Sequence, residues 1–356
     1  MINNAFTGSN FWLGKRVLVT GHSGFKGTWL TLWLLSLGAQ VTGVSLPPNT
    51  HPSLFNLAKI DHKCNSLFCD IRDLSALTTT FHEAQPEIIF HLAAQPLVRE
   101  SYLDPIKTFS TNVMGTVNLL ETIRVCGGTR VVVMITTDKV YRNHEMLLPY
   151  LEDDPLGGFD PYSASKAASE MAIAGYRDSF LSEQGIAVAS ARAGNVIGGG
   201  DWSEDRLIPD AIRTWQKGDL LDIRMPDAIR PWQHVLEPLC GYIVLAQQLW
   251  DLPSLAGAYN FGPESSDATS VHAVIELARA AYGKGDVRYA KDIEGPHEAA
   301  LLTLEIKKAK EILGVKPRLT LDQAITLTMD WYREQEAGVN AYDICNEQIK
   351  LYEGLL

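Results

Sequence analysis

The sequence predicts an α/β fold, in which a doubly wound parallel sheet is followed by a smaller C-terminal α/β domain. Three observations favour this fold. Short apolar runs rich in β-branched residues alternate with longer segments of helical period through the first half of the chain. A glycine-rich turn joins the first apolar run to the first helical segment. The alternation stops after Gly194, where glycines, prolines and short mixed segments begin.

Six runs are expected to form the strands of this sheet. Each is mostly apolar, because helices cover both faces of a parallel sheet and leave neither face in water. In chain order the runs cover residues 16–20, 41–46, 66–70, 87–92, 130–136 and 186–191.

Helical segments fill the gaps between these strands. The two longest, residues 105–126 and 163–183, are rich in Ala, Leu, Met and Glu and repeat apolar residues at spacings of three and four. In the second half, the expected helices cover residues 207–216, 271–282 and 321–331, and the expected short strands cover 259–262 and 287–289.

Residues 28–50 carry no charged side chain, and a run of that length could suggest a membrane span. However, Gly38 and the Pro47–Pro48 pair interrupt the run. It is better explained by a buried helix over residues 29–37, a turn and the second strand.

Composition narrows the class of protein. Hydrophobic residues make up 46% and charged residues 21%, which is typical of a folded, soluble chain. The formal net charge of -11 repels nucleic acid and anionic lipid, so neither is an expected partner. The five cysteines lack CxxC and zinc spacings, so no disulfide framework and no metal site are expected. Residues 1–16 lack the pattern of a secretory signal, and a cytoplasmic location is expected.

The turn after the first strand, residues 21–27, reads GHSGFKG. Glycines there allow a tight turn and a close approach of the backbone to a pyrophosphate, and the following helix N-terminus supplies N–H donors. This context favours dinucleotide binding over an ordinary glycine turn, whereas for the His22 side chain packing and cofactor contact are equally open. The expected cofactor contacts in the turn are Gly21, His22, Gly24, Phe25 and Gly27.

The residues alone leave the choice between NAD and NADP open. The second strand ends without the carboxylate that usually selects NAD. Lys26 could contact the 2′-phosphate of NADP, or it could be a solvated lysine. Asp70 and the adjacent Ile71, after the third strand, are expected near the adenine, although Asp70 could equally be a helix N-terminal acid.

A tyrosine and a lysine four residues apart, Tyr162 and Lys166, stand at the start of a predicted helix and therefore share one of its faces. A fixed ammonium near a phenol lowers the pKa of the phenol, so Tyr162 is expected to act as a base toward an alcohol. A tyrosine and a lysine at this spacing occur by chance in many helices. Together with the upstream glycine turn, the pair is a much more specific sign of this chemistry.

These motifs, the segment HLAAQ at residues 91–95 and Asn112 within NVMGTVNLLE resemble the extended short-chain dehydrogenase/reductase family over nearly the whole chain. The resemblance implies a Rossmann-type sheet, with a dinucleotide-binding domain at residues 1–193, to which residues 231–257 return, and a mainly nucleotide-sugar-binding domain at 194–356. It also implies NAD as cofactor. Further cofactor contacts implied by it are Leu92, Ala93, Ala94, Tyr162 and Lys166.

The segment ITTDKVY, residues 135–141, is similar to the nucleotide-sugar 4,6-dehydratases of the family, which carry Thr-Asp-Glu there. Thr137 and Asp138 match, whereas Lys139 replaces the glutamate, as in members that act on CDP-glucose. The segments GHSGFKGTWL, AQPLVRESY, RAGNVIGGGDW, DRLIP, RPWQHVLEPL and PHEA resemble the same members. Because Asp138 could simply cap a turn and Lys139 could be an exposed turn lysine, their catalytic roles rest on this resemblance.

The reaction implied is the dehydration of CDP-D-glucose to CDP-4-keto-6-deoxy-D-glucose, a hydro-lyase step of deoxysugar and lipopolysaccharide biosynthesis. Tyr162 and Thr137 would act at O4, Lys166 would hold the ribose and the phenolate, and Asp138 would protonate the departing O6. Removal of the C5 proton stays open, since Lys139 can serve as a base only when neutral. A 4-epimerase, another 4,6-dehydratase and a non-enzymatic NAD(P)-sensing protein are the alternatives.

The resemblance also implies contacts to the substrate. Arg206, Arg230 and His234 could instead be surface or interdomain residues, and this alternative is weakest for Arg230, because cationic forks suit a diphosphate. The two long helices resemble the pair that forms a family homodimer, so a homodimer or a dimer of dimers is expected. The implied substrate contacts are Gln95, Asn195, Arg206, Leu207, Arg230 and His234.

Overall fold

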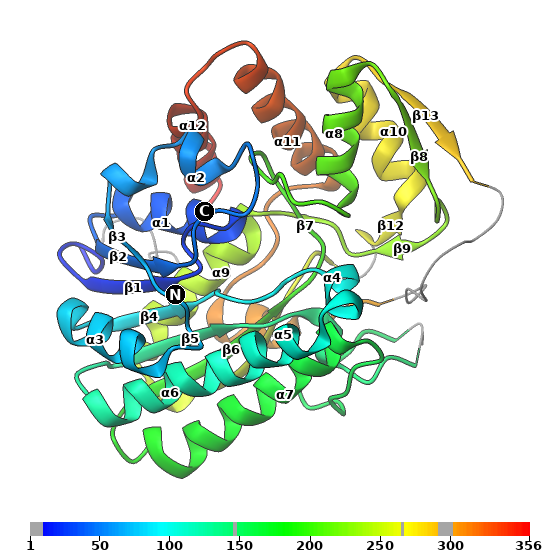
Figure 1. The fold of residues 1–356 in the computed structure, drawn as a ribbon. Helices are drawn as coiled ribbons and strands as arrows, with labels where there is room; N and C mark the ends of the chain where they lie inside the picture. Colours follow the sequence, from blue (N-terminus) through cyan, green and yellow to red (C-terminus); the bar gives the residue numbers. More distant parts are fainter. Residues whose placement is uncertain (1–9, 145–147, 265–266, 291–301) are drawn as a thin grey trace.

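A computed structural model describes residues 10–144, 148–264, 267–290 and 302–356. Its centre is a seven-stranded, wholly parallel sheet with the order β11-β6-β5-β4-β1-β2-β3 (Figure 1). The predicted doubly wound sheet is therefore confirmed. The strands are β1 Arg16–Thr20, β2 Gln40–Ser45, β3 Asn65–Phe68, β4 Ile88–His91, β5 Val131–Ile135, β6 Ala187–Ala193 and β11 Gly257–Phe261.

The seventh strand, β11, comes from the second half of the chain and pairs with the edge of β6. The sequence predicts a strand at this place but not its membership of the central sheet. The helix α9 (Leu236–Asp251) leads to β11 and lies against β5 and β6. The division of the chain into two domains at Gly194 stays a prediction.

Helices cover both faces of the sheet. On one face lie α3 (Leu74–Ala84), α6 (Gly115–Cys126) and α7 (Pro161–Tyr176), and on the other lie α1 (Phe25–Ser36) and α9. Along β5 the side chains alternate between the two cores: Val131 and Val133 join the core with α1 and α9, whereas Val132 and Met134 join the other. This alternation explains why the strand reads as a continuous apolar run.

The two longest predicted helices are each continuous but contain a π-helical turn. The first runs through α5 (Pro105–Phe109), η2 (Ser110–Met114) and α6, and the second continues from α7 into η4 (Arg177–Leu181). The shorter elements of the first half are α2 Leu54–Leu57, η1 Ile60–His62, α4 Val98–Leu103 and η3 Asp138–Val140.

The second half adds a smaller α/β part beside the carboxyl end of the sheet (Figure 1). Its small sheets pair β13 with β8, β12 with β9 and β10 with β7. The remaining elements are β7 Val196–Ile197, α8 Leu207–Lys217, β8 Leu220–Ile223, β9 Ile229–Arg230, β10 Gln233–His234, η5 Pro253–Leu255, β12 Thr269–Ser270, α10 Val271–Tyr282, β13 Asp286–Tyr289, η7 Ala309–Leu313, α11 Leu321–Glu336 and α12 Ala341–Glu353.

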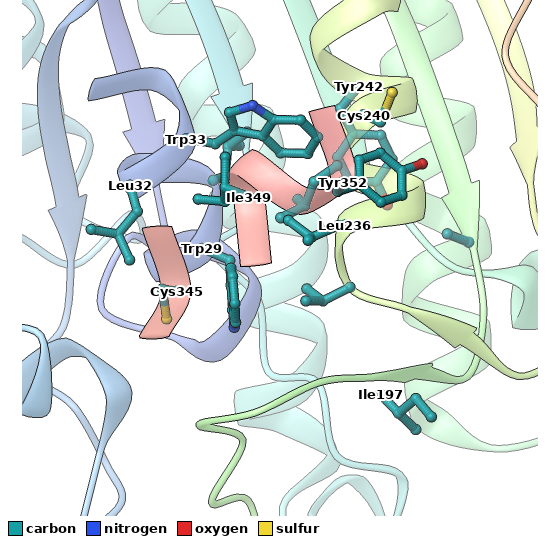
Figure 2. Packing of buried hydrophobic residues seen from close by; sticks show 14 of the residues in the cluster. Trp29, Leu32, Trp33, Ile197, Leu236, Cys240, Tyr242, Cys345, Ile349 and Tyr352 are labelled. Carbon is teal, nitrogen blue, oxygen red and sulfur yellow. The ribbon is translucent and has the colours of Figure 1, made fainter. Parts of the chain in front are cut away.

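The C-terminal helix α12 returns to the sheet and packs on α1. Trp33 and Tyr352 meet edge to face with 5.7 Å between ring centroids, and Figure 2 shows Ile349 beside them. Tyr352 also donates a hydrogen bond to the buried carboxylate of Glu237 on α9. The end of the chain thus closes the core over α1 and α9. In the part of the chain that the structure describes, no helix is both long and apolar enough to cross a membrane.

Candidate active site

The predicted site residues gather at the carboxyl ends of the central strands. The glycine turn follows β1, the segment from Leu92 follows β4, and Thr137 and Asp138 follow β5. Sheet order reverses between β1 and β4, which are neighbours although two strands separate them in the chain. In open α/β sheets, ligands bind outside the carboxyl edge at such a reversal.

The glycine turn is built as a cradle for a phosphate. Gly21 has a φ of +77°, and a Cβ there would lie 2.7 Å from the backbone nitrogen of Ala93. A Cβ on Gly27 would lie 2.0 Å from the carbonyl oxygen of Gly21. Gly24 is different, since the closest atom to its Cβ would be 3.4 Å away and the residue is exposed. Two glycines therefore allow the tight turn, and the third leaves backbone open to a ligand, as a dinucleotide diphosphate requires.

His22 supports the turn by packing. Its ring is fully buried, with Nδ1 3.0 Å from Ser45 Oγ and Nε2 2.7 Å from Ser66 Oγ. Burial lowers the pKa of His22 to about 4, so the ring is neutral at pH 7. A Cβ on Gly43 would come within 2.2 Å of this ring, so the glycine in β2 makes room for the histidine. The His22 side chain therefore ties the turn to β2 and β3.

The residues predicted near the adenine lie at the exposed end of β3. Asp70 accepts hydrogen bonds from the backbone and guanidinium of Arg72, and this partner lowers the pKa of Asp70. Ile71 is buried, and its side chain occupies the space beside Gly115 of α6. Both residues stay predicted cofactor contacts, with Asp70 already engaged by Arg72.

Thr137 and Asp138 form a buried pair after β5. Both are at most 5% exposed, and Thr137 Oγ1 donates a hydrogen bond of 2.9 Å to Asp138 Oδ1. Gly194, at the end of β6, lies so close that a Cβ there would be 1.9 Å from Asp138 Oδ2. Only glycine fits beside this carboxylate. Lys139 follows in the short helix η3 and is partly exposed.

Tyr162 and Lys166 start helix α7, whose N-terminus is fixed by a capping box between Asp160 and Ser163. The expectation that Lys166 lowers the pKa of Tyr162 is wrong. Burial dominates and raises the pKa of Tyr162 to about 12, although a hydrogen bond with Thr137 opposes the rise. The Lys166 ammonium instead donates a hydrogen bond of 3.2 Å to the carbonyl oxygen of Ile135.

A buried ion pair lies beneath this helix, and sequence reasoning missed it. Glu170, one turn beyond Lys166, pairs with Arg192 of β6 at 2.8 Å, and both side chains are 4% exposed. The Glu170 carboxylate also accepts hydrogen bonds from Thr136 and from Ser190. Its charge opposes the desolvation that lowers the pKa of Lys166 to about 8. The spacing of four residues from Lys166 was the available signal.

Lys26 does not lie where NADP selection requires. Its ammonium donates a hydrogen bond of 3.1 Å to the hydroxyl of Tyr242 on α9. The charges that act on it are Arg206, Lys166 and Asp138, all at the catalytic end of the sheet. The 2′-phosphate of NADP would lie at the opposite end, over β2 and β3. The position of Lys26 therefore does not support a 2′-phosphate contact, and the side chain is half-buried rather than fully solvated.

The predicted substrate residues separate into two groups. Arg206 lies close enough to Tyr162 to act on its pKa, and Arg206 pairs with the buried Asp201 at 2.7 Å. Leu207 begins α8 directly after it, and Asn195, with a φ of +36°, follows β6.

Of the other predicted substrate residues, two are buried in protein and one is partly exposed. Gln95 is buried, and its side chain bonds to Leu97 and Thr108. His234 is fully buried against Trp29. Arg230 lies on β9 in the smaller part, where it donates to the carbonyl of Ile229. The segment PHEA, residues 296–299, lies outside the described residues.

Metal chemistry has no support among the described residues, which hold no group of three or more His, Cys, Asp or Glu side chains placed to bind an ion. All five cysteines are free thiols. What the geometry provides is an exposed backbone cradle and, next to it, a buried cluster of one tyrosine, one carboxylate and three cations.

Comparisons with known proteins agree with this arrangement. The sequence model of the family described as GDP-mannose 4,6 dehydratase matches residues 18–328. The chain is 48% identical to a CDP-glucose 4,6-dehydratase of Salmonella typhimurium over 95% of this chain and 96% of that protein. It is 29% identical to a dTDP-glucose 4,6-dehydratase of Xanthomonas campestris over 90% and 94% of the two chains.

A solved structure shares the fold of this chain. The UDP-glucose 4-epimerase of Thermus thermophilus, solved as a complex with NAD, superposes with a TM-score of 0.77 at 28% identity. The match covers 89% of this chain and 99% of the other.

Proposed function

Since the chain belongs to the GDP-mannose 4,6-dehydratase family of extended short-chain dehydrogenases/reductases, we propose that it is an NAD-dependent hydro-lyase that converts CDP-D-glucose to CDP-4-keto-6-deoxy-D-glucose. The observation that carries this proposal is the buried Thr137–Asp138 pair beside Tyr162 and Lys166. The near full-length identity of 48% to a CDP-glucose 4,6-dehydratase supports CDP-glucose as the substrate.

The residues present fit NAD. Gly24 opens the turn to the diphosphate, and Lys26 is turned toward Tyr242. NAD, when bound, would supply a hydride acceptor for C4 of the sugar and a hydride donor for C6. Tyr162 and Lys166 would hold its nicotinamide ribose.

Tyr162 takes the proton of the substrate O4. The Thr137 hydroxyl, which donates to Asp138 in the free enzyme, turns to donate to O4 when the substrate binds. The positive charge of Arg206 favours the phenolate form of Tyr162. Lys166 keeps its positive charge with the help of Glu170. The C4 carbonyl that forms then makes the C5 proton acidic.

Asp138 donates its proton to the O6 hydroxyl, which leaves as water. The C5 proton leaves to an active-site base; Lys139, the side chain that follows Asp138, can take this role only in its neutral form, and its alternative role is to polarise the enolate. The substrate loses one water, the hydride moves from C4 to C6, and the base returns a proton to C5. Asp138 has to start each turnover protonated, so the proton that Tyr162 takes from O4 passes through solvent to Asp138 before the next turnover.

A nucleotide-sugar 4-epimerase is the second candidate, because a solved 4-epimerase shares this fold. An epimerase uses the tyrosine–lysine pair but has no elimination step. It therefore does not require an acid at the position of Asp138. The close packing of Gly194 on that carboxylate favours the dehydratase, because it fixes the acid beside Thr137.

Hydrogen labels separate the two reactions. Substrate deuterated at C4 is expected to give product with the deuterium at C6, because the hydride stays in the active site. In heavy water, unlabelled substrate is expected to gain deuterium at C5, where the base exchanges its proton with solvent. Mass spectrometry of the product measures both. Retention of the label at C4, or no solvent hydrogen at C5, would rule out elimination.

We also propose a homodimer, or a dimer of dimers, formed through α5, α6 and α7. These helices and the intervening turn η2 carry exposed apolar side chains, among them Ile106 of α5 at 82%, Met114 of η2 at 51% and Met171 of α7 at 69% exposure. Apolar side chains gathered on two adjacent helices suit a helix-packed interface. Sedimentation should show a dimer or tetramer, and Ile106→Glu with Met171→Glu should shift it to monomer. A wild-type monomer at micromolar concentration contradicts this proposal.

A cytoplasmic location and a role in deoxysugar synthesis of the lipopolysaccharide type complete the proposal. Five free thiols suit a reducing compartment.

A further inference from the structure

Lys26 is a half-buried cation that the proposed mechanism does not use. Its position in the turn lies one residue before the last glycine, yet its side chain extends away from the adenosine end of the sheet. Nζ lies 3.1 Å from the Tyr242 hydroxyl and 5.3 Å from the centre of the Tyr242 ring. Tyr242 is fully buried in α9, within the packed core shown in Figure 2, so it is a rigid partner.

The neighbours of Lys26 place it beside the nicotinamide end of the cofactor site. A dinucleotide diphosphate lies on the glycine turn, and its nicotinamide half extends toward Tyr162 and Lys166. Lys26 leaves the same turn and approaches Lys166, Asp138 and Arg206, whose charges all act on it. Its ammonium, bonded to Tyr242, is therefore near enough to these groups for their charges to act on it.

We propose that Lys26, held by Tyr242, is a positioning residue that places a positive charge beside the nicotinamide and raises the reduction potential of the bound cofactor. This inference rests on the proposed use of NAD. The oxidised nicotinamide ring is a cation and the reduced ring is neutral, so a nearby ammonium destabilises the oxidised form relative to the reduced one. In the first half-reaction the C4–H bond of the sugar breaks, two electrons move with that hydrogen to the ring, and the O4 proton goes to Tyr162. Lys26 favours this step.

The charge of Lys26 depends on its surroundings. Burial, followed by repulsion from Arg206 and Lys166, lowers the pKa of Lys26 to about 7, and Asp138 opposes this. The groups that face it are Tyr242 from α9, Lys166 from α7, Arg206 before α8 and Asp138 after β5. A cofactor diphosphate at the turn adds negative charge and so favours the ammonium form.

The test is the ratio of the dissociation constants for NAD and NADH, measured with the purified enzyme by fluorescence titration with NADH and competition by NAD. Lys26→Met should lower this ratio about tenfold. For a two-electron couple, that change equals about 30 mV. Lys26→Arg, which keeps the charge, should retain most of the ratio, and Lys217→Met, at an exposed lysine of α8, should leave it unchanged.

The wild-type ratio should also be higher at pH 6 than at pH 9, since Lys26 is charged at the lower pH, and Lys26→Met should remove that part of the dependence. Lys26→Gln, which can still bond to the Tyr242 hydroxyl, keeps the test decisive if Lys26→Met does not fold, because an unchanged ratio in Lys26→Gln overturns the proposal. If Lys26→Met weakens the binding of NAD and NADH equally, the role of Lys26 is structural, and this result also overturns the proposal. Wild-type enzyme that binds both nucleotides but does not convert CDP-glucose would contradict the substrate proposal and leave this one standing.

Discussion

Tyr162→Phe is expected to reduce turnover by about a hundredfold or more while cofactor binding and folding stay close to normal. The variant removes the hydroxyl that accepts the O4 proton, and a positioned general base typically contributes a factor of this size. The ring remains in place, and the helix start depends on Asp160 and Ser163 rather than on the phenol. Steady-state assays with CDP-glucose, thermal unfolding and NADH titration measure the three properties.

The pH profile adds a second readout for Tyr162. With a pKa of about 12, only a small fraction of Tyr162 is phenolate at neutral pH, and this fraction grows with pH. Lys166, with a pKa of about 8, keeps its charge below that pH. Wild-type turnover should therefore rise from pH 6 to pH 8, and the rise should be lost in Tyr162→Phe. Tyr102→Phe, at a more exposed tyrosine of α4, is the matched control. Near-normal turnover of Tyr162→Phe would remove Tyr162 from the mechanism.

The sequence predicts the parallel sheet and the chemistry at its edge because both depend on local pattern. The first strand, the glycine turn and α1 follow from apolar runs and from backbone conformations that only glycine adopts easily. The Tyr162–Lys166 spacing follows from helical period, and the relation to the extended short-chain dehydrogenases/reductases is confirmed by the match over residues 18–328.

The features that were not predicted depend on contacts between distant segments. The seventh strand pairs with β6 only because α9 brings it back across the sheet. The pKa of Tyr162 depends mainly on burial, which cannot be deduced from the spacing of residues in the sequence. The sequence suggests that Lys26 is a surface residue in a turn. In the structure its ammonium donates a hydrogen bond to Tyr242, which is 216 positions away in the chain. Side-chain direction at the site is therefore a tertiary property.

Asp138→Asn is expected to reduce product formation by about two to four orders of magnitude, because the O6 hydroxyl then lacks its acid. The amide has the same shape as the carboxyl, and its oxygen can still accept the hydrogen bond that Thr137 donates. Gly194 should therefore remain packed against the side chain as it is now. We expect the variant to fold and to bind substrate.

The step at which the reaction of the Asp138→Asn enzyme stops is more informative than the size of the loss in product formation. Oxidation at C4 needs Tyr162, Thr137 and Lys166 but not the acid, so reduced cofactor should accumulate on the enzyme and absorb at the wavelength typical of NADH. In heavy water, C5 of recovered material should still exchange, because the acid acts after that proton has left. Asp153→Asn, at an exposed position in the same part of the chain, should behave as wild type. If Asp138→Asn forms product normally, or fails before any cofactor is reduced, Asp138 is not the acid that expels O6.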